Sequence, residues 1–178
     1  RHTEDGRSTD ILQRVVETGP DGYVIEGQEI DFGGYQRQHY DAQQNLRARE
    51  LSTRKRIRFE PYYPAFRFPL APGASWSGEV AIRRSWDERF AVDRSLSYRV
   101  AGWEDVTVPA GTFRALHVVG EGRNRGTNGE RPARGQFSDE YWYVPAVKRW
   151  VRRDTDEPDG PDRRRVERWE LVEYTVKP

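Results

Sequence analysis

The sequence predicts a single all-β domain made of antiparallel strands, with few or no helices. Short segments rich in Val, Tyr, Phe, Trp and Arg alternate with clusters of Gly, Pro, Asn and Asp, a spacing typical of antiparallel sheets. No long segment shows the apolar period of an amphipathic helix. A chain of 178 residues is long enough to bury one sizeable core and is within the size range of one domain.

The elements follow from this pattern in chain order. The opening segment RHTEDGRS is polar and has no period, so we expect residues 1–8 to be a flexible leader before a β domain at 9–178. We expect strands at 11–17, 23–30, 34–40, 46–51, 57–60, 75–86, 89–102, 105–108, 112–121, 136–144, 147–153 and 164–176. The segment DAQQN at 41–45 is expected to be a hairpin loop, because residues 42–51 are too poor in apolar side chains to anchor a helix.

A tight hairpin is predicted for the octet VTVPAGTF at 106–113. Pro109 fixes φ for the first corner of a type I turn, and Gly111 tolerates the left-handed conformation that follows it. Val106 and Val108 alternate before the turn, as strand residues do. We interpret the octet as a structural turn without chemistry of its own.

Two other segments are predicted to be irregular. Prolines interrupt FEPYYPAFRFPLAPGASW at 59–76, so it is expected to be an extended segment that crosses the end or mouth of the sheet. The stretch GEGRNRGTNGERPARGQ at 120–136 is rich in glycine and charge and is expected to be a mobile hairpin tip.

Composition excludes several classes of function. The 30 basic and 29 acidic residues nearly cancel, so no overall charge attracts nucleic acid or an anionic membrane. The chain has no cysteine, which excludes disulfides, a thiolate nucleophile and a cysteine zinc site. No apolar run approaches the length of a membrane span. We therefore predict no nucleic-acid partner and no transmembrane segment in this chain.

Three motifs occur in order between residues 59 and 153: FRFPLAPGASW, VTVPAGTF and YWYVPAVKRWVRR. As a set they resemble an uncharacterised family of bacterial envelope proteins, secreted or lipid-anchored. The resemblance implies a strongly curved sheet, a half-barrel or open barrel similar to that of periplasmic lipoprotein carriers. It also implies an extracytoplasmic address, in the periplasm or outer envelope, with the signal segment outside this chain. The KRW at 148–150 departs from the family, which often has a small glycine-containing turn there.

No metal site, cofactor or catalytic residue emerges from the polar residues. The acidic segment DTDEPDGPD at 154–162 offers oxygen ligands of the kind Ca²⁺ prefers, but its spacing does not match an EF-hand and favours a solvated turn. The histidines His2, His39 and His117 are far apart in sequence. The basic runs at 54–58 and 163–165 are suited to phosphate, although acidic residues are interleaved with them.

Adjacent carboxylates are weak evidence for catalysis in this chain. A glycosidase needs two carboxylates that face one another, whereas neighbours on a strand, such as Asp139 and Glu140, point to opposite faces. We expect this pair to form cross-strand ion pairs with Arg149, Arg152 or Arg153.

The aromatic residues are the strongest candidates for a functional surface. They fill an ordinary core on one interpretation, and line a cavity on the concave face of the sheet on the other. The candidate ligand-lining residues are Tyr62, Tyr63, Phe66, Trp76, Trp86, Trp103, Trp142 and Trp150.

These observations favour a non-catalytic extracytoplasmic domain that binds an apolar or lipid-like ligand or docks an envelope protein. The first alternative is a structural or adaptor module of the envelope. The second is a hydrolase whose carboxylates converge only in the fold. Binding predicts an apolar cavity, the adaptor predicts an exposed patch, and the hydrolase predicts a cleft with a carboxylate of raised pKa.

Overall fold

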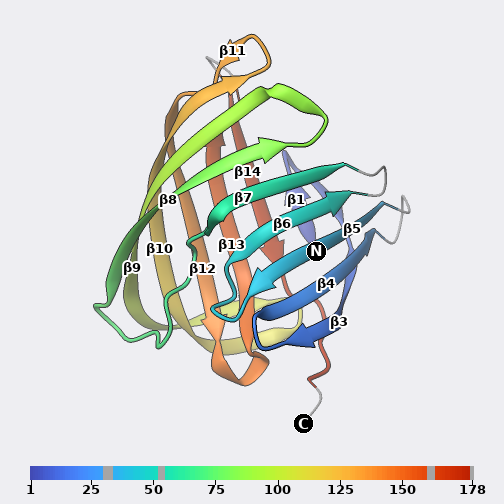
Figure 1. Ribbon diagram of the computed structural model, residues 1–178. Helices are drawn as coiled ribbons and strands as arrows, with labels where there is room; N and C mark the ends of the chain where they lie inside the picture. Colours follow the sequence, from blue (N-terminus) through green and yellow to red (C-terminus); the bar gives the residue numbers. More distant parts are fainter. Residues whose placement is uncertain (30–33, 52–54, 160–162, 177–178) are drawn as a thin grey trace.

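The chain folds as one antiparallel sheet that curls into a nearly closed barrel-like shell (Figure 1). The computed structural model describes residues 1–29, 34–51, 55–159 and 163–176. Among these residues there is no α-helix, and a single 3₁₀ turn, η1 (Pro145–Val147), follows the YWYV segment. The predicted all-β, single-domain, curved antiparallel fold is confirmed.

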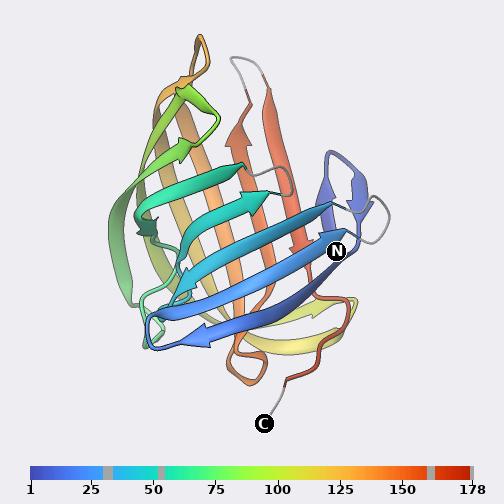
Figure 2. The ribbon, with the colours of Figure 1, turned by 45° about the vertical axis from the view of Figure 1, so that its right-hand side comes forward.

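The strands of the shell are short at its N-terminal side and long in its middle. They are β1 (His2–Glu4), β2 (Arg7–Thr9), β3 (Ile11–Gly19), β4 (Gly22–Glu29), β5 (Tyr35–Asp41), β6 (Leu46–Leu51), β7 (Arg56–Tyr63), β8 (Ser75–Arg84), β9 (Asp87–Val108), β10 (Gly111–Asn128), β11 (Arg131–Pro132), β12 (Gly135–Val144), β13 (Arg149–Pro158) and β14 (Arg164–Glu170). The spatial order is β2-β1-β14-β13-β12-β10-β9-β8-β7-β6-β5-β4-β3, with β11 beside β10. Strands β2 and β3, at the two ends of this order, are consecutive in the chain, so the sheet curls back toward its own start (Figure 2).

Residues 1–8 are not a flexible leader. They contain β1 and the start of β2, which form a small hairpin, and β1 pairs with β14 from His2↔Trp169 to Glu4↔Glu167. The side chain of Arg1 also forms an ion pair of 3.0 Å with Asp10. The prediction was wrong because composition reports the polarity of side chains, whereas this segment is held by backbone hydrogen bonds and ion pairs.

The charged stretch at 120–136 is largely strand and not a mobile tip. Strand β10 continues to Asn128 and pairs with β9 along its length, and β12 begins at Gly135. The turn is confined to the few residues around Gly129, whose φ is 66°. Glycine and charge misled the prediction because alternate residues of β10 face solvent, where charges are compatible with a strand.

The proline-rich segment is a strand at its start and irregular afterwards. Strand β7 includes Pro61 and Tyr63, and residues 64–74 continue without regular structure except for a turn at 72–73. Asn45 binds this segment at two points: its Nδ2 donates to the Phe66 carbonyl (3.0 Å), and the Phe66 amide donates to its Oδ1 (2.8 Å). Phe66 is thereby held against the rings of Tyr141 and Tyr143.

Two apolar clusters form on opposite faces of the sheet. The larger is on the inner face and includes Phe59, Ile82, Leu96, Val118 and Phe137. The smaller is on the outer face, where the turn of the β9–β10 hairpin packs against β12, η1 and β13; its buried residues are Val106, Val108, Ala115, Trp142, Val144, Val147 and Val151. The C-terminal part of β12, from Tyr141 to Val144, is therefore buried on both faces.

The VTVPAGTF hairpin is formed as predicted. Val108 pairs with Gly111 across Pro109 and Ala110, and Gly111 has a φ of 129°, in the region that favours glycine. The Ala110 amide donates to the carbonyl of Leu171 (3.0 Å), which ties the turn to the chain after β14.

Replacing Gly111 with Val is expected to lower the free energy of unfolding by about 1–2 kcal/mol, because a Cβ at this φ is strained. An added Cβ meets no atom within 4 Å, so the strain is that of the backbone alone. Urea unfolding measures the change. Gly19→Val is the control, because Gly19 also has open space but no positive φ; equal losses in the two variants would contradict the turn assignment.

Candidate functional site

An interior cavity of about 190 Å³ lies within the curled sheet. Its walls come from strands on both sides of the shell, between β5 and β9 on one side and from β12 to β14 on the other. One part of the lining is apolar and includes Leu46, Ile57, Phe59, Ile82, Phe90 and Phe137. The rest is polar and unusually rich in arginine: Arg49, Arg84, Arg94, Arg153 and Arg165.

Asp139 of β12 is the buried anion beside this cavity, with 0% of its surface exposed. Its Oδ2 accepts hydrogen bonds from the hydroxyls of Tyr63 (2.9 Å), Tyr98 (3.0 Å) and Tyr141 (2.8 Å). Its Oδ1 accepts from Nε of Arg153 (2.9 Å). Four donors from four strands therefore satisfy one carboxylate, which is what allows a charge to be buried.

The sheet register explains how these donors converge. Tyr98, Gly120 and Asp139 are opposite one another on β9, β10 and β12. A Cβ on Gly120 would be 2.2 Å from Cε1 of Tyr98, so the tyrosine ring lies directly over the glycine. The missing side chain thus lets Tyr98 cross β10 and donate to Asp139. Tyr141, two residues after Asp139 on β12, is opposite Arg153 on β13.

The three phenols stay protonated around this anion. Burial and the charge of Asp139 raise the pKa of Tyr63 to about 12. Burial likewise raises the pKa of Tyr98 and Tyr141 well above the ordinary value, with Asp139 adding to both. Burial alone would lower the pKa of Arg153, but the neighbouring Asp139 outweighs it and raises the pKa. Asp139 and its four donors, which we call the Asp139 hub, are therefore an ion pair with Arg153 and three neutral tyrosine donors.

A second ionic group lies further along the same wall. Glu157 of β13 forms ion pairs with Arg94 of β9 and Arg165 of β14. The guanidinium of Arg94 also stacks 4.6 Å from the ring centre of Phe137. Both arginines therefore have a carboxylate partner within the shell.

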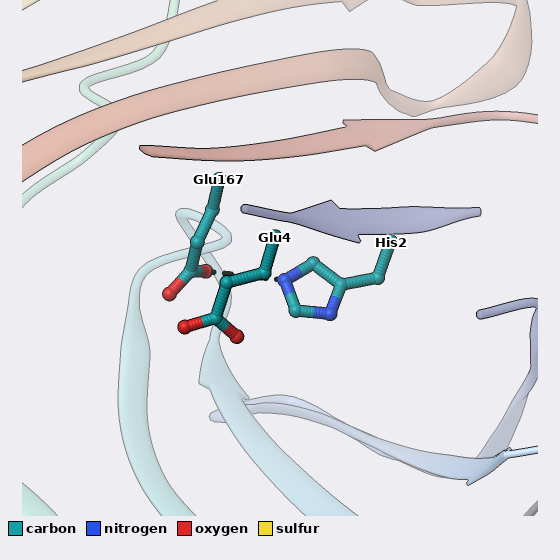
Figure 3. Close-up of side chains that lie close together, drawn as sticks. All are labelled: His2, Glu4 and Glu167. Carbon is teal, nitrogen blue, oxygen red and sulfur yellow. Dashed lines mark ion pairs between the residues drawn. The ribbon is translucent and has the colours of Figure 1, made fainter. Parts of the chain in front are cut away.

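His2, Glu4 and Glu167 meet where β1 pairs with β14 (Figure 3). Their nearest ligand atoms lie within 4.8 Å of one another, and His2 Nε2 is 3.4 Å from Glu167 Oε2. One imidazole and two carboxylates suit a divalent cation. However, Nε of Arg165 is 3.1 Å from Glu167 and 3.9 Å from Glu4. A guanidinium thus already supplies the positive charge, and we describe the group as an ion cluster.

Arg49 and Arg84 differ from the other arginines of the cavity. Neither has a carboxylate within ion-pair distance among the residues that the structure describes. Arg84 stacks on Phe90, with 3.7 Å between its guanidinium carbon and the ring centre. Burial lowers the pKa of both Arg49 and Arg84, and the charges of Arg153 and Arg165 respectively add to this. The more distant charges of Glu167, for Arg49, and Asp87, for Arg84, oppose the lowering without reversing it.

The predicted ligand-lining residues are divided among several environments. Tyr63, Phe66 and Trp150 line the cavity. Trp76 is buried in the inner cluster and donates from Nε1 to the Pro64 carbonyl (2.9 Å). Trp142 packs in the outer cluster, and Tyr62 is half-buried outside the cavity lining. Trp86 and Trp103 are exposed, at 38% and 43%.

The other sequence candidates are engaged in ion pairs. Asp139 pairs with Arg153, one of the three partners expected for it, whereas Glu140 bonds to His117 (2.8 Å). In the acidic segment, Asp154 pairs with Arg152 and Arg168, and Asp156 with Arg164. Asp162 of that segment and Arg54 of the basic run lie outside the described residues. His39 pairs with Glu50 at 3.2 Å.

Sequence reasoning missed Arg49, Arg84 and Arg94. For Arg84 and Arg94 the alternation of β8 and β9 was the available signal, since it places them on the same face as Ile82 and Val92. A further depression, of about 710 Å³, lies over β8, β9, β10 and β12 and is lined mainly by serine and charged residues such as Ser77, Glu79 and Arg123.

No helix in the described part of the chain has the length and apolarity to cross a membrane.

Comparison with known proteins places the fold among structures from bacterial lipoproteins and exported proteins. The hypothetical lipoprotein YmcC of Escherichia coli K12 superposes with a TM-score of 0.56 at 11% identity, over 98% of this chain and 83% of that one. A candidate exported protein with a YmcC-like fold from Bacteroides fragilis gives 0.55 at 16% identity, over 94% and 91%. A candidate lipoprotein of Parabacteroides distasonis gives 0.52 at 15% identity, over 94% and 89%.

These similarities show a shared fold. No family model matches the sequence. No curated protein matches it either. The resemblance of the VTVPAGTF set to an envelope family therefore stays a prediction, while the barrel-like sheet that it implied is observed.

Asp139→Asn is expected to lower the free energy of unfolding by about 3 kcal/mol or more, because it leaves Arg153 as an unpaired buried charge and turns an amide N–H toward tyrosine donors. Chemical denaturation measures the loss. Asp93→Asn is the matched control: Asp93 pairs with Arg83 at 2.8 Å, but its side chain is 64% exposed, and its loss is expected to be below about 1 kcal/mol. Comparable losses would show that Asp139 is not a structural hub.

Glu167 is expected to contribute to stability against acid. Burial alone would raise its pKa, but the His2 hydrogen bond and the charges of Arg165 and Arg153 lower it from 4.5 to about 2. The folded pKa lies below the unfolded one, so this stabilisation is present above pH 4.5 and is lost as pH falls toward 2. Its size is on the order of 3 kcal/mol.

Glu167→Gln removes this group and is expected to flatten the fall of unfolding free energy between pH 5 and pH 2, as followed by urea unfolding at several pH values. Glu60→Gln, at a side chain that is 55% exposed and paired with Arg58, is the surface control. A pH dependence in Glu167→Gln as steep as in the unaltered protein would refute the assignment.

Proposed function

We propose that this chain is a non-catalytic extracytoplasmic domain that binds an apolar or lipid-like ligand inside its curled sheet. The observation that carries the proposal is the interior cavity, which has a continuous apolar wall at Leu46, Ile57, Phe59 and Ile82. Barrel interiors with such walls are common sites for small apolar ligands. A cavity of this kind supports binding in preference to a closed core, although its lining is polar as well as apolar.

The compartment is inferred from the neighbours and the composition. The solved structures that share the fold carry the names of lipoproteins or exported proteins. A chain without cysteine is compatible with an oxidising compartment, where a free thiol is a liability. Both observations support an envelope location, as does the resemblance of the three sequence motifs.

The arrangement of the interior carboxylates favours binding over hydrolysis. Asp139 is occupied by four donors, and Glu157 is paired with two arginines. Glu167 has a lowered pKa, which is the opposite of what a general acid requires. The neighbours with the same fold also carry no catalytic name.

The adaptor alternative is supported by a different surface. Strand β3 is at one end of the sheet order, and Leu12, Val15 and Val16 on it are 45%, 58% and 40% exposed. An edge strand with exposed apolar side chains is suited to pairing with another chain. This alternative does not require a ligand in the cavity.

A neutral single-chain amphiphile tests the binding proposal without invoking charge. Dodecanol is expected to raise the melting temperature of the protein by roughly 5 °C at a hundredfold excess over its Kd, because it binds the native state only. Ile57→Trp fills the cavity from β7 and is expected to abolish the shift. Val166→Trp, at a side chain on β14 that is 54% exposed, is the control and is expected to retain it.

Absence of a shift in the unaltered protein, with no bound amphiphile in native mass spectra, would favour the adaptor alternative. Mass spectra of protein purified without detergent also report any apolar molecule retained from the cell. An identical shift in the Ile57→Trp variant would place the binding site elsewhere.

A further inference from the structure

The charges around the cavity are not balanced within the shell. Five guanidinium groups line it, against the carboxylates of Glu157 and Glu167. The buried Asp139 neutralises Arg153, and the two glutamates pair with Arg94 and Arg165. Arg49 and Arg84 remain without a carboxylate partner among the described residues.

Of these two arginines, Arg49 has the guanidinium whose burial costs more free energy. Its Nε is buried and has no hydrogen-bond partner in the described part of the structure. Removing a guanidinium from water without a compensating acceptor is unfavourable, and burial accordingly lowers the pKa of Arg49. Arginine nevertheless keeps its proton in proteins, so a positive charge faces the cavity.

The sheet register brings the two arginines together. Gln38, Arg49, Ile57 and Arg84 are opposite one another on β5, β6, β7 and β8. All four line the cavity. Strand spacing puts the backbones of Arg49 and Arg84 about 10 Å apart, so that Ile57 lies between two long cationic side chains.

We propose that this row holds the anionic group of a single-chain amphiphile, a carboxylate or a phosphate, with Arg49 and Arg84 as its ligands and Gln38 as a further donor. The inference rests on the proposed function, because it assigns the polar end of the ligand that the apolar wall would hold. Arginine suits both anions, since its planar donors match their oxygens.

The size and layout of the cavity favour one chain over two. Its volume of about 190 Å³ is below the roughly 300–1,000 Å³ of pockets that enclose a drug-sized ligand. It therefore accommodates a head group and the first part of one alkyl chain. The apolar surface next to Arg49 and Arg84 begins at Ile57 and continues to Phe59 on the same strand.

Isothermal titration calorimetry with a matched pair of probes tests this assignment. Dodecanoate and dodecanol share a chain and differ in charge; dodecanoate is used below its micellar concentration and dodecanol below its solubility in water. Dodecanoate is expected to bind at least about tenfold more tightly, because hydrogen bonds to charged groups are among the stronger ones. Dodecyl phosphate is expected to bind in the same way.

Arg49→Gln is expected to weaken dodecanoate binding by about tenfold and to leave dodecanol binding unchanged. Its melting temperature is expected to be equal or higher, because the variant removes a buried charge that has no carboxylate partner among the described residues. Arg47→Gln is the matched control on the same strand, where Arg47 is exposed, and is expected to bind both probes as the unaltered protein does. Arg84→Gln repeats the test at the second arginine, should Arg49→Gln fail to fold.

The outcomes separate the two proposals. Equal affinities for dodecanoate and dodecanol would overturn the anion assignment and leave the apolar site in place. Binding of neither probe would overturn the proposed function itself. Inorganic phosphate that competes with dodecanoate at similar affinity would show that the site takes a free anion, which would overturn the amphiphile assignment.

Discussion

The rest of the structure depends on the burial of one carboxylate, that of Asp139. A charge in this position is tolerable only when it is paired and hydrogen-bonded, and Asp139 accepts hydrogen bonds from Tyr63, Tyr98, Tyr141 and Arg153. These donors come from β7, β9, β12 and β13, so the carboxylate ties together strands that are not all neighbours. Hydrogen-bond geometry is directional, which fixes these walls relative to one another more narrowly than apolar contact alone would. The register that places Gly120 between Tyr98 and Asp139 is thus as necessary as the charged groups themselves.

A polar hub inside a barrel changes what the remaining interior can do. On the walls that contain β12 to β14, Arg153 is paired with Asp139 and Arg165 with Glu157, so both guanidinium charges have a carboxylate partner within the protein. The wall formed by β6 to β8 is different, because its apolar residues are accompanied by Arg49 and Arg84, which have no carboxylate partner in the described part of the chain. A folded protein gains nothing in stability from an unpaired buried charge. Arg49 and Arg84 are therefore more easily explained by a bound ligand than by a contribution to folding. Binding sites in general sacrifice some stability for function.

The sequence predicted the fold far better than the site, for physical reasons. Alternation and turn residues are local properties, and they located most strands within a few residues and the hairpin at Pro109 and Gly111. The leader was missed because β1 is stabilised by ladder bonds to β14, a partner more than 150 residues away. Trp142 was misplaced because aromatic residues serve the outer cluster as well as the inner one, and the C-terminal part of β12 has both faces buried. Arg49 had no distinguishing local pattern in a chain rich in arginine, since the absence of a carboxylate partner among the described residues depends on where carboxylates from distant segments lie.

The outer cluster helps to explain how so small a shell can contain a polar interior. In a barrel of this size the inner face usually supplies the whole hydrophobic core, which leaves little room for arginine and glutamate. Here the β9–β10 hairpin folds against the outer face, where Val106, Trp142 and Val151 form an apolar cluster of their own. Part of the hydrophobic stabilisation is thereby moved outside the shell. The inner face can then keep polar side chains and an unfilled volume, because the strands that carry them are also held from the other side. The VTVPAGTF turn thus has no chemistry of its own, yet the cluster that it anchors supports the wall on which the cavity is built.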